Sequence, residues 1–212
     1  IKKCLKKMPA LDKKFENLFS DLNIKHKEKK NIFCDYCKLI FKWNKKINLT
    51  AIDSYEDMMV KHIADSLSIC DLIDGDKIAD VGTGAGLPGV PLAIVHPNKN
   101  FLLIDSNLKK IDFLNHVKLT LGIENIEPYH IRIEKLPKER IFDTIVTRAY
   151  GSLLKLYEDA NKNLGKAGRI VSMKGRLPKA EIDMLPEKLD VSIKKLDVPS
   201  LSAERHAIII RM

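Results

Sequence analysis

The sequence lacks any apolar run near the roughly 18 residues that a membrane-spanning helix needs, and its hydrophobic residues are those of an ordinary globular core. Its lysine-rich start has neither the apolar centre nor the small-residue cleavage site of a signal peptide. Internal repeats and low-complexity linkers are also missing. We therefore expect a cytoplasmic monomer with no membrane partner, and 212 residues suffice for one domain with an appendage.

Cysteine is scarce, with four residues at positions 4, 34, 37 and 70. Cys34 and Cys37 have the spacing of half a zinc site, but no second cysteine pair and no suitably spaced histidine pair follows. The segment Ile32–Ile47 has helical periodicity, which places both thiols on one helix face. We interpret them as small core residues and expect no metal.

Arginine is also rare, with 7 residues against 30 lysines, and the positive charge is unevenly distributed. Residues 1–50 hold 14 Lys, no Arg and 5 acids, a balance of +9, whereas the remaining 162 residues hold 23 basic and 23 acidic side chains. One-sided positive charge favours a polyanionic partner such as RNA, DNA or an anionic membrane. The alternative is a solvated face in a lysine-biased chain.

The first 75 residues have helical periodicity. Apolar side chains recur at helical spacing over residues 11–22, 28–47 and 55–73, with lysines on the remaining faces of the first two segments. The aromatic and methionine residues among them are interpreted as core. We predict a basic helical extension over residues 1–75 that docks RNA, followed by a second domain over residues 76–212.

After residue 75 the pattern changes to alternating strands and helices. Strands are predicted over residues 77–81, 100–105, 125–129, 142–147 and 168–173, and helices over 88–95, 109–121 and 153–164. Residues 188–197 and 205–212 also alternate as strands, with no helix between them, which predicts an antiparallel hairpin at the sheet edge. The expected fold is α/β, with a mixed, mostly parallel seven-stranded sheet and helices on both faces.

A glycine-rich loop, Asp80-Val-Gly-Thr-Gly-Ala-Gly-Leu-Pro-Gly89, joins the first of these strands to its helix. Because glycine has no Cβ, Gly82 and Gly84 let backbone N–H groups approach a ligand closely, as in nucleotide-binding sheets. The dinucleotide fingerprint G-x-G-x-x-G also fits residues 84–89, but it begins two residues after Gly82, where the strand ends and the glycines start. The carboxylate of Asp80 would also repel a pyrophosphate. S-adenosylmethionine carries a cationic sulfonium and no phosphate, so we predict it as the cofactor.

A second acid strengthens this prediction. Asp105 ends the second strand, where a carboxylate can accept hydrogen bonds from both ribose hydroxyls. Ile133 and Glu134 follow the third strand, where an adenine edge would lie. A surface carboxylate or a helix cap is the alternative for each acid, but Asp80 and Asp105 together at strand ends favour a cofactor site.

Six segments, in this order, resemble the ribosomal small-subunit methyltransferase G family, also called glucose-inhibited division protein B. They are Lys42–Thr50, His62–Ser66, Asp80–Gly89, Thr147–Tyr150, Met173–Gly175 and Glu204–His206. The resemblance covers nearly the whole chain and implies a class I methyltransferase fold. It also implies methyl transfer from S-adenosylmethionine to N7 of one guanine in 16S ribosomal RNA, free or in a small-subunit particle. By the family pattern, the cofactor contacts would be Gly82, Leu87, Ile133, Glu134 and Arg148.

The residues themselves agree with this target atom. Guanine N7 has a free lone pair, so its methylation needs orientation more than a general base. Thr147–Tyr150 lacks the Pro-Pro-aromatic signature that is typical of methylation at an exocyclic amine. Methylation at pyrimidine C5 needs a cysteine nucleophile near the loop, and all four cysteines precede the sheet. Arg148 is predicted to orient cofactor and guanine, with a structural ion pair as the alternative. Lys174 and Arg205 are predicted to complete the catalytic rim and hold RNA phosphates.

Other polar positions near these motifs have two interpretations each. Tyr150 is predicted either to stack on an RNA base or to pack in the core. His62 and Asp65 lie one helical turn apart and are expected to pair. Asn44, Asn48 and Thr50 close the second predicted helix and are expected to cap it rather than turn the chain towards the cofactor. His206 is expected to be structural or to contact phosphate rather than act as a base.

Three other functions stay open on the sequence, one of which is a methyltransferase that acts on another nucleobase atom. A nicotinamide-dependent oxidoreductase could use the same sheet, although Asp80 and the missing Tyr-x-x-x-Lys arrangement disfavour it. An RNA-binding assembly factor with a vestigial cofactor site is the second alternative, and the complete set of Asp80, Asp105 and loop glycines argues against it.

Overall fold

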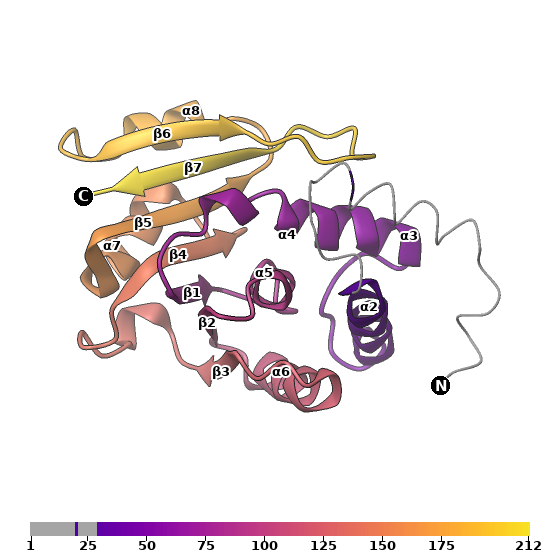
Figure 1. Ribbon diagram of the computed structural model, residues 1–212. Helices are drawn as coiled ribbons and strands as arrows, with labels where there is room; N and C mark the ends of the chain where they lie inside the picture. Colours follow the sequence, from indigo (N-terminus) through magenta and orange to yellow (C-terminus); the bar gives the residue numbers. More distant parts are fainter. Residues whose placement is uncertain (1–19, 21–28) are drawn as a thin grey trace.

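A computed structural model describes residue 20 and residues 29–212 of the chain; the other residues are drawn as a grey trace in Figure 1. The helix predicted over residues 11–22, apart from residue 20, and the thiol of Cys4 therefore lie outside the described residues. Among the residues that are described, no helix is both long and apolar enough to cross a membrane.

A seven-stranded sheet forms the centre of the molecule, with strand order β3-β2-β1-β4-β5-β7-β6 (Figure 1). The strands are β1 Lys77–Val81, β2 Asn100–Asp105, β3 Ile126–His130, β4 Phe142–Arg148, β5 Leu164–Lys174, β6 Asp190–Lys195 and β7 His206–Arg211. Strands β1 to β5 pair in parallel, whereas β7 runs antiparallel to both β5 and β6. The predicted mixed sheet with a terminal antiparallel hairpin is therefore confirmed.

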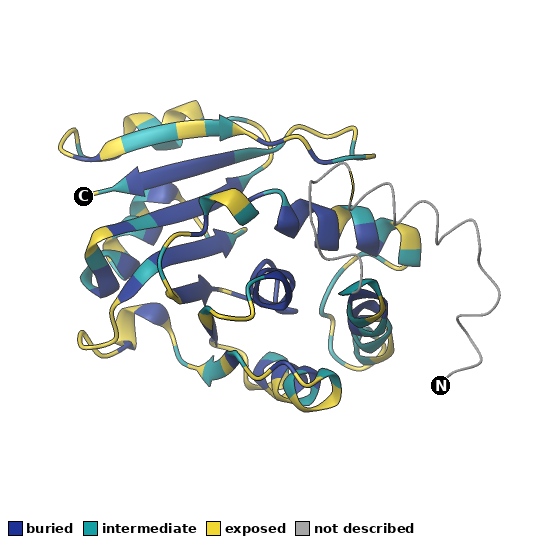
Figure 2. Ribbon diagram, in the orientation of Figure 1, coloured by how far each residue is buried: buried dark blue, intermediate teal, exposed yellow. Residues whose placement is uncertain are grey.

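Helices cover both faces of this sheet. They are α2 Lys30–Asn44, α5 Gly89–Val95, α6 Leu108–Leu121, α7 Leu153–Ala160 and α8 Lys179–Asp183. Along β1, Ile78 packs in the core with α2, α5 and α6, whereas Ala79 and Val81 pack in the core with α7, because successive strand residues face opposite sides. Figure 2 shows the consequence, with β7 and most of β4, β5 and α5 in the dark blue of buried residues.

The strand β5 begins four residues earlier than the sequence predicts. Helix α7 ends at Ala160, a 3₁₀ turn η6 follows over Asn161–Asn163, and β5 starts at Leu164. Two glycines, Gly165 and Gly168, make residues 164–168 resemble a loop. The pairing with β4 is irregular there, with a register shift between Phe142 and Thr144 that accommodates the early start.

The described part of the chain before residue 75 consists of helical segments joined by a loop over residues 45–54. Helix α2 buries Phe33, Cys34, Tyr36, Cys37 and Ile40 along one stripe, which confirms the core interpretation of the two cysteines. The stripe lies in the same apolar core as the sheet. The division at residue 75 remains a prediction, since one core spans it.

A second helical stretch follows, but it is not a single α-helix. It consists of α3 Tyr55–Met58, a π-helical segment η3 Met59–Ala64 and α4 Asp65–Leu67, with a 3₁₀ turn η4 at Cys70–Leu72. Ser54 caps it by accepting a hydrogen bond from Asp57 N at 3.1 Å. Hydrophobic spacing predicts the helix over residues 55–73 but does not distinguish a π turn from an α turn.

Candidate active site at the carboxyl ends of the strands

The glycine loop between β1 and α5 is held by two carboxylates. Asp80 Oδ2 accepts hydrogen bonds from Thr83 Oγ1 at 2.6 Å and from Gly89 N at 2.8 Å. Asp105 Oδ2 accepts one from Gly84 N at 2.9 Å. Gly84 and Gly86 both have positive φ, of 59° and 92°, a conformation that side chains disfavour. Both acids predicted from the sequence thus shape the loop itself.

Asp80 lies behind the loop and is fully buried. Burial raises the pKa of this carboxyl to about 6, although the hydrogen bonds from Thr83 and Gly89 oppose that shift. Its second oxygen, Oδ1, is buried and has no hydrogen-bond partner among the described residues. The structure therefore gives Asp80 a role in holding the loop, and its direct contact with a cofactor remains a prediction.

A small cavity of about 160 Å³ opens beside the loop, where β1, β2 and β3 end. Four of the eight predicted cofactor residues line it, namely Gly82, Asp105, Ile133 and Glu134. The other four lie elsewhere among the described residues: Asp80 behind the loop, Gly84 within the loop bonded to Asp105, Leu87 in the apolar core and Arg148 in a second hollow.

The residues that line the cavity have the chemistry that an adenosine group needs. Gly82 has φ of 70°, and a Cβ there would lie 3.3 Å from the ring of Tyr150, so a side chain would narrow the space. Ile131 and Ile133 provide an apolar wall, and Asp105 and Glu134 provide hydrogen-bond acceptors. The residues present thus fit the nucleoside part of S-adenosylmethionine.

A larger hollow of about 440 Å³ lies on the other side of the turn that follows β4. All three predicted catalytic residues line it: Arg148 from the end of β4, Lys174 from the end of β5 and Arg205 from the approach to β7. Residues Lys61, His62 and Asp65 of the helical extension complete its wall. The fold therefore gathers basic side chains that are far apart in the sequence.

Asp65 links the two arginines of this hollow. Its Oδ2 accepts a hydrogen bond from Arg148 Nη1 at 3.0 Å, and its Oδ1 accepts one from Arg205 Nε at 2.8 Å. The Asp65 side chain is only 2% exposed, so both ion pairs are shielded from water. The predicted His62–Asp65 pair is corrected here, since the carboxylate of Asp65 bonds to the arginines instead.

His62 lies between Thr50 and Arg148 in the wall of the hollow. Its Nε2 lies 2.8 Å from Thr50 Oγ1 and its Nδ1 lies 3.1 Å from the carbonyl oxygen of Lys61, which we assign as an Nδ1–H donor and an Nε2 acceptor. Burial, and then the neighbouring Arg148 charge, lower the pKa of His62 to about 4. The imidazole is therefore neutral at pH 7.

Asn44 positions Thr50 for that contact. Its side-chain oxygen accepts hydrogen bonds from the backbone N–H groups of Leu49 and Thr50, and its amide donates to the carbonyl of Thr50. Asn44 thus folds the loop after α2 back towards the hollow, rather than capping the helix as expected.

The turn after β4 separates the cofactor cavity from the basic hollow. Arg148 and Ala149 line the hollow, whereas the next residue, Tyr150, lines the cofactor cavity. Ala149 has φ of 63°, an unusual value for a residue with a Cβ, and such backbone outliers cluster at functional sites. Tyr150 donates its hydroxyl hydrogen to Asp159 Oδ2 at 2.8 Å, which ties its ring to the cofactor side.

Comparison with known proteins identifies the family. A sequence model described as rRNA small subunit methyltransferase G matches residues 29–209. The chain belongs to this family. A relative from Escherichia coli O17:K52:H18, named ribosomal RNA small subunit methyltransferase G, is 40% identical over 200 residues, which cover 93% of this chain and 97% of the relative. One from Shigella boydii serotype 18 with the same name is 42% identical over 183 residues, 86% of this chain and 88% of the relative.

Solved structures agree on the fold. A SAM-dependent methyltransferase from Aquifex aeolicus superposes with a TM-score of 0.58 at 18% identity, over 77% of this chain and 96% of that one. TrmN from Thermus thermophilus superposes with a TM-score of 0.55 at 20% identity, over 69% of this chain and 47% of that one. The class I methyltransferase fold is thus confirmed, and family membership makes this protein an S-adenosylmethionine-dependent methyltransferase rather than a nicotinamide oxidoreductase.

The remaining predicted rim residues have well-defined partners. Lys174 Nζ donates to the carbonyl of Gly151 at 3.0 Å and to Glu181 Oε2 at 2.9 Å, which holds its chain along the hollow. His206 Nδ1 lies 2.8 Å from the carbonyl of Gly175 and does not line the hollow. The sequence pattern predicts no site role for Lys61 or Asp65, because a π-helical segment decides which residues of that stretch face the sheet.

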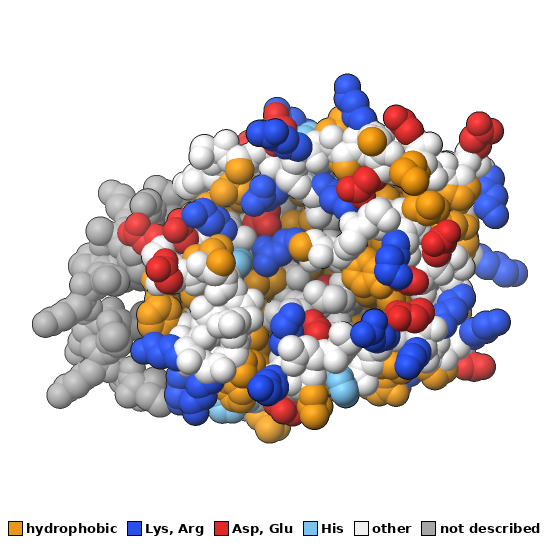
Figure 3. Space-filling model, turned by 180° about the vertical axis from the view of Figure 1, so that it is seen from behind, with side chains coloured by type: hydrophobic (Ala, Val, Ile, Leu, Met, Phe, Trp, Pro, Cys, Tyr) orange, Lys and Arg blue, Asp and Glu red, His pale blue; other side chains and the backbone are white. Residues whose placement is uncertain are grey.

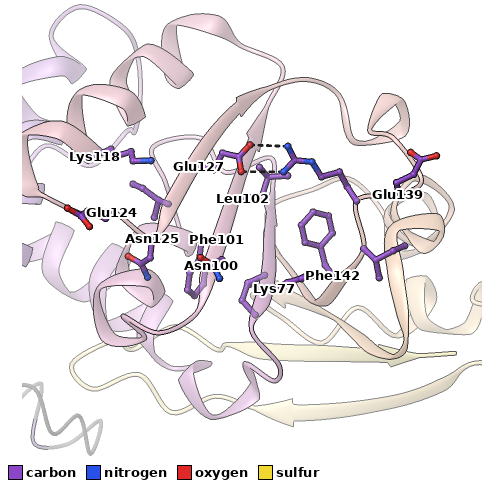
Figure 4. Close-up of a pocket in the computed structure, with 14 residues that line it drawn as sticks. Lys77, Asn100, Phe101, Leu102, Lys118, Glu124, Asn125, Glu127, Glu139 and Phe142 are labelled. Carbon is purple, nitrogen blue, oxygen red and sulfur yellow. Dashed lines mark hydrogen bonds and ion pairs between the residues drawn. The ribbon is translucent and has the colours of Figure 1, made fainter.

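Another hollow, of about 460 Å³, lies at the opposite edge of the sheet, where the parallel strands begin (Figure 4). The ion pair between Glu127 and Arg140 crosses it at 3.2 Å, and it contains none of the predicted site residues. Since open α/β sheets bind their ligands beyond the carboxyl ends of the strands, this hollow is not the cofactor site.

Proposed function

We propose that this protein transfers the methyl group of S-adenosylmethionine to N7 of one guanine in 16S ribosomal RNA. The observation that carries the proposal is the pair of cavities that meet at Arg148–Tyr150, one suited to adenosine and the other basic. When bound, the cofactor supplies an electrophilic methyl group. The names of the relatives support ribosomal RNA of the small subunit as the acceptor.

The choice of N7 rests on what the basic hollow offers. Among the described residues that line it, Asp65 is the only acid, and both of its oxygens accept hydrogen bonds from arginines. His62 has its two ring nitrogens engaged by Thr50 and Lys61. No lining residue is therefore placed as a ready general base. Guanine N7 suits such a site, because it attacks through its lone pair and loses no proton.

Arg148, Lys174 and Arg205 would then bind the acceptor nucleotide. A guanidinium can donate two hydrogen bonds to the O6 and N7 edge of guanine or to a phosphate. In the structure, Arg148 Nη1 is bonded to Asp65 and to the carbonyl of Lys61 at 3.0 Å, which fixes the plane of its guanidinium. Arg148 is thus held ready to orient the base beside the turn that separates the two cavities.

The helical extension would dock the RNA. The end of α2 and the loop after it expose Lys42, Lys45 and Lys46, and the loop leads directly to Thr50 beside the hollow. Figure 3, which views the molecule from behind, shows lysine and arginine side chains spread over that face, with acidic side chains among them. A polyanion following these lysines would reach the hollow without crossing the sheet. Lys25 and Lys27, which also contribute to the positive charge of residues 1–50, lie outside the described residues.

The direct test is to map the modified nucleotide. The protein is incubated with isotopically labelled S-adenosylmethionine and either naked 16S RNA or unmethylated small-subunit particles, and the RNA is digested and analysed by mass spectrometry. The expected product is 7-methylguanosine at a single position, which an Arg148→Ala variant makes far more slowly. A methyl group on another atom would contradict the proposal, and RNA binding without any methyl transfer would favour the assembly-factor alternative.

A further inference from the structure

The helical extension touches the cofactor loop directly. Tyr36, in the middle of α2, is fully buried, and its hydroxyl donates a hydrogen bond to the carbonyl oxygen of Ala85 at 2.5 Å. This bond joins positions that are 49 residues apart in the sequence. A Cβ on Gly86 would lie 2.9 Å from the same hydroxyl, so the tyrosine also packs against the next residue of the loop.

Three side chains thus hold the loop. Asp80 and Asp105 hold it from the sheet, through Gly89 and Gly84, and Tyr36 holds it from the helical extension. Tyr36 bonds to the residue between two glycines that both have positive φ. Glycines lose more conformational freedom on ordering than other residues, and a bond at this point limits the states that both can visit.

We propose that Tyr36 is a positioning residue for the cofactor, whose hydroxyl keeps the loop in the conformation that binds S-adenosylmethionine. The helical extension would then have a second task besides RNA docking, because α2 carries Tyr36 on its buried face and lysines on its exposed face. The proposal depends on the cofactor and not on which RNA atom is methylated, so the two proposals can fail separately.

The hydroxyl of Tyr36 is suited to a permanent structural bond. Burial raises the pKa of Tyr36 well above its ordinary value, so the group stays protonated and remains a donor throughout the working pH range. Replacing the hydroxyl of Tyr36 by a hydrogen atom removes this hydrogen bond to the Ala85 carbonyl, while the aromatic ring still fills the same space in the core. Tyr36→Phe therefore tests the hydrogen bond without creating a cavity.

The chain offers a matched control. Tyr55, at the start of α3, donates its hydroxyl hydrogen to the carbonyl oxygen of Cys34 in α2 at 2.6 Å. This is also a bond from a tyrosine hydroxyl to a backbone carbonyl, but it does not reach the loop. Tyr55→Phe and Tyr36→Phe should lower the thermal unfolding midpoint by similar amounts. Any effect that only Tyr36→Phe produces on the cofactor then comes from the loop and not from general loss of stability.

The experiment compares the two variants with the wild-type protein. In calorimetric titration with S-adenosylhomocysteine, the dissociation constant should be about fivefold higher for Tyr36→Phe than for wild type, which corresponds to the loss of one hydrogen bond of roughly 1 kcal/mol. For Tyr55→Phe the dissociation constant should change by less than about twofold. Amide hydrogen exchange of residues 84–87 should accelerate in Tyr36→Phe alone. In turnover assays, KM for S-adenosylmethionine should rise while KM for RNA does not. Equal effects of both variants, or unchanged affinity in Tyr36→Phe, would overturn the proposal.

Discussion

The carboxylate of Asp65 holds two arginines of the basic hollow, and its removal tests how the site works. Asp65→Asn keeps the shape of the side chain but replaces one acceptor oxygen by an NH₂ group. The amide can still accept a hydrogen bond from Arg148 or from Arg205, but not from both, and its NH₂ group would face the other guanidinium. The variant also removes the negative charge that balances these two positive ones.

The size of the effect follows from burial. The Asp65 side chain is 2% exposed, and the two arginine side chains are 22% and 24% exposed, so water compensates little of the loss. Breaking a buried ion pair by removing one partner costs about 3–5 kcal/mol. We expect part of this cost in stability and part in catalysis, with turnover falling by about 100-fold because Arg148 and Arg205 lose their fixed orientation.

Methyl transfer to 16S RNA with labelled cofactor measures turnover, and urea denaturation measures stability. Affinity for S-adenosylhomocysteine should stay within about threefold of wild type, since Asp65 does not line the cofactor cavity. Asp71→Asn is the control, because Asp71 makes a solvent-exposed ion pair with Lys194, and such pairs contribute about 0–1 kcal/mol. Wild-type turnover in Asp65→Asn would refute the idea that Asp65 positions the arginines.

Three further predictions follow from the same structure. The pKa of His62 is lowered to about 4 from 6.5, so below pH 6.5 the unfolded chain binds a proton that the folded protein does not. The free energy of unfolding of wild type should therefore exceed that of His62→Gln by less at pH 5 than at pH 7 in urea titrations. A difference that stays constant with pH would contradict this. A Cβ on Gly89 would lie 2.6 Å from Asp80 Oδ2 and 2.4 Å from Leu103 Cδ2, so Gly89→Ala should abolish S-adenosylhomocysteine binding. Gly122→Ala is the control, since a Cβ there would meet nothing within 4 Å. It should lower the free energy of unfolding by about 1 kcal/mol and leave S-adenosylhomocysteine binding normal. Replacing Lys42, Lys45 and Lys46 by Glu should weaken RNA binding in filter assays and flatten its salt dependence, with cofactor affinity unchanged; unaltered RNA affinity would refute docking by α2.

The order and type of the elements could be predicted from the sequence because the signals are local. Lys77–Val81 and Asn100–Asp105 form strands with the predicted bounds, each a short apolar run bounded by polar or glycine residues. The prediction was weaker where glycine and strand signals conflict, as at residues 164–168. The π-helical segment at Met59–Ala64 has no sequence signal of its own, and it places Lys61 and His62 at the hollow.

The candidate site could be predicted in part for the same reason. Asp80, Asp105 and the loop glycines stand at strand ends, and parallel strands place their carboxyl ends at one edge, so their proximity follows from the fold class. Which atoms they bind does not follow from it. The acids were predicted to contact the cofactor, yet in the structure both bond to backbone N–H groups of the loop.

The sequence by itself determined the fold class, the glycine loop and the family, because these depend on residues that are close together in the chain or on ordered motifs. Only the tertiary structure decided how the site is held. Asp65 meets Arg148 and Arg205 across 83 and 140 residues, and Tyr36 meets the loop across 49. Such contacts depend on the direction of a helix face and on packing in a shared core, which no local pattern records.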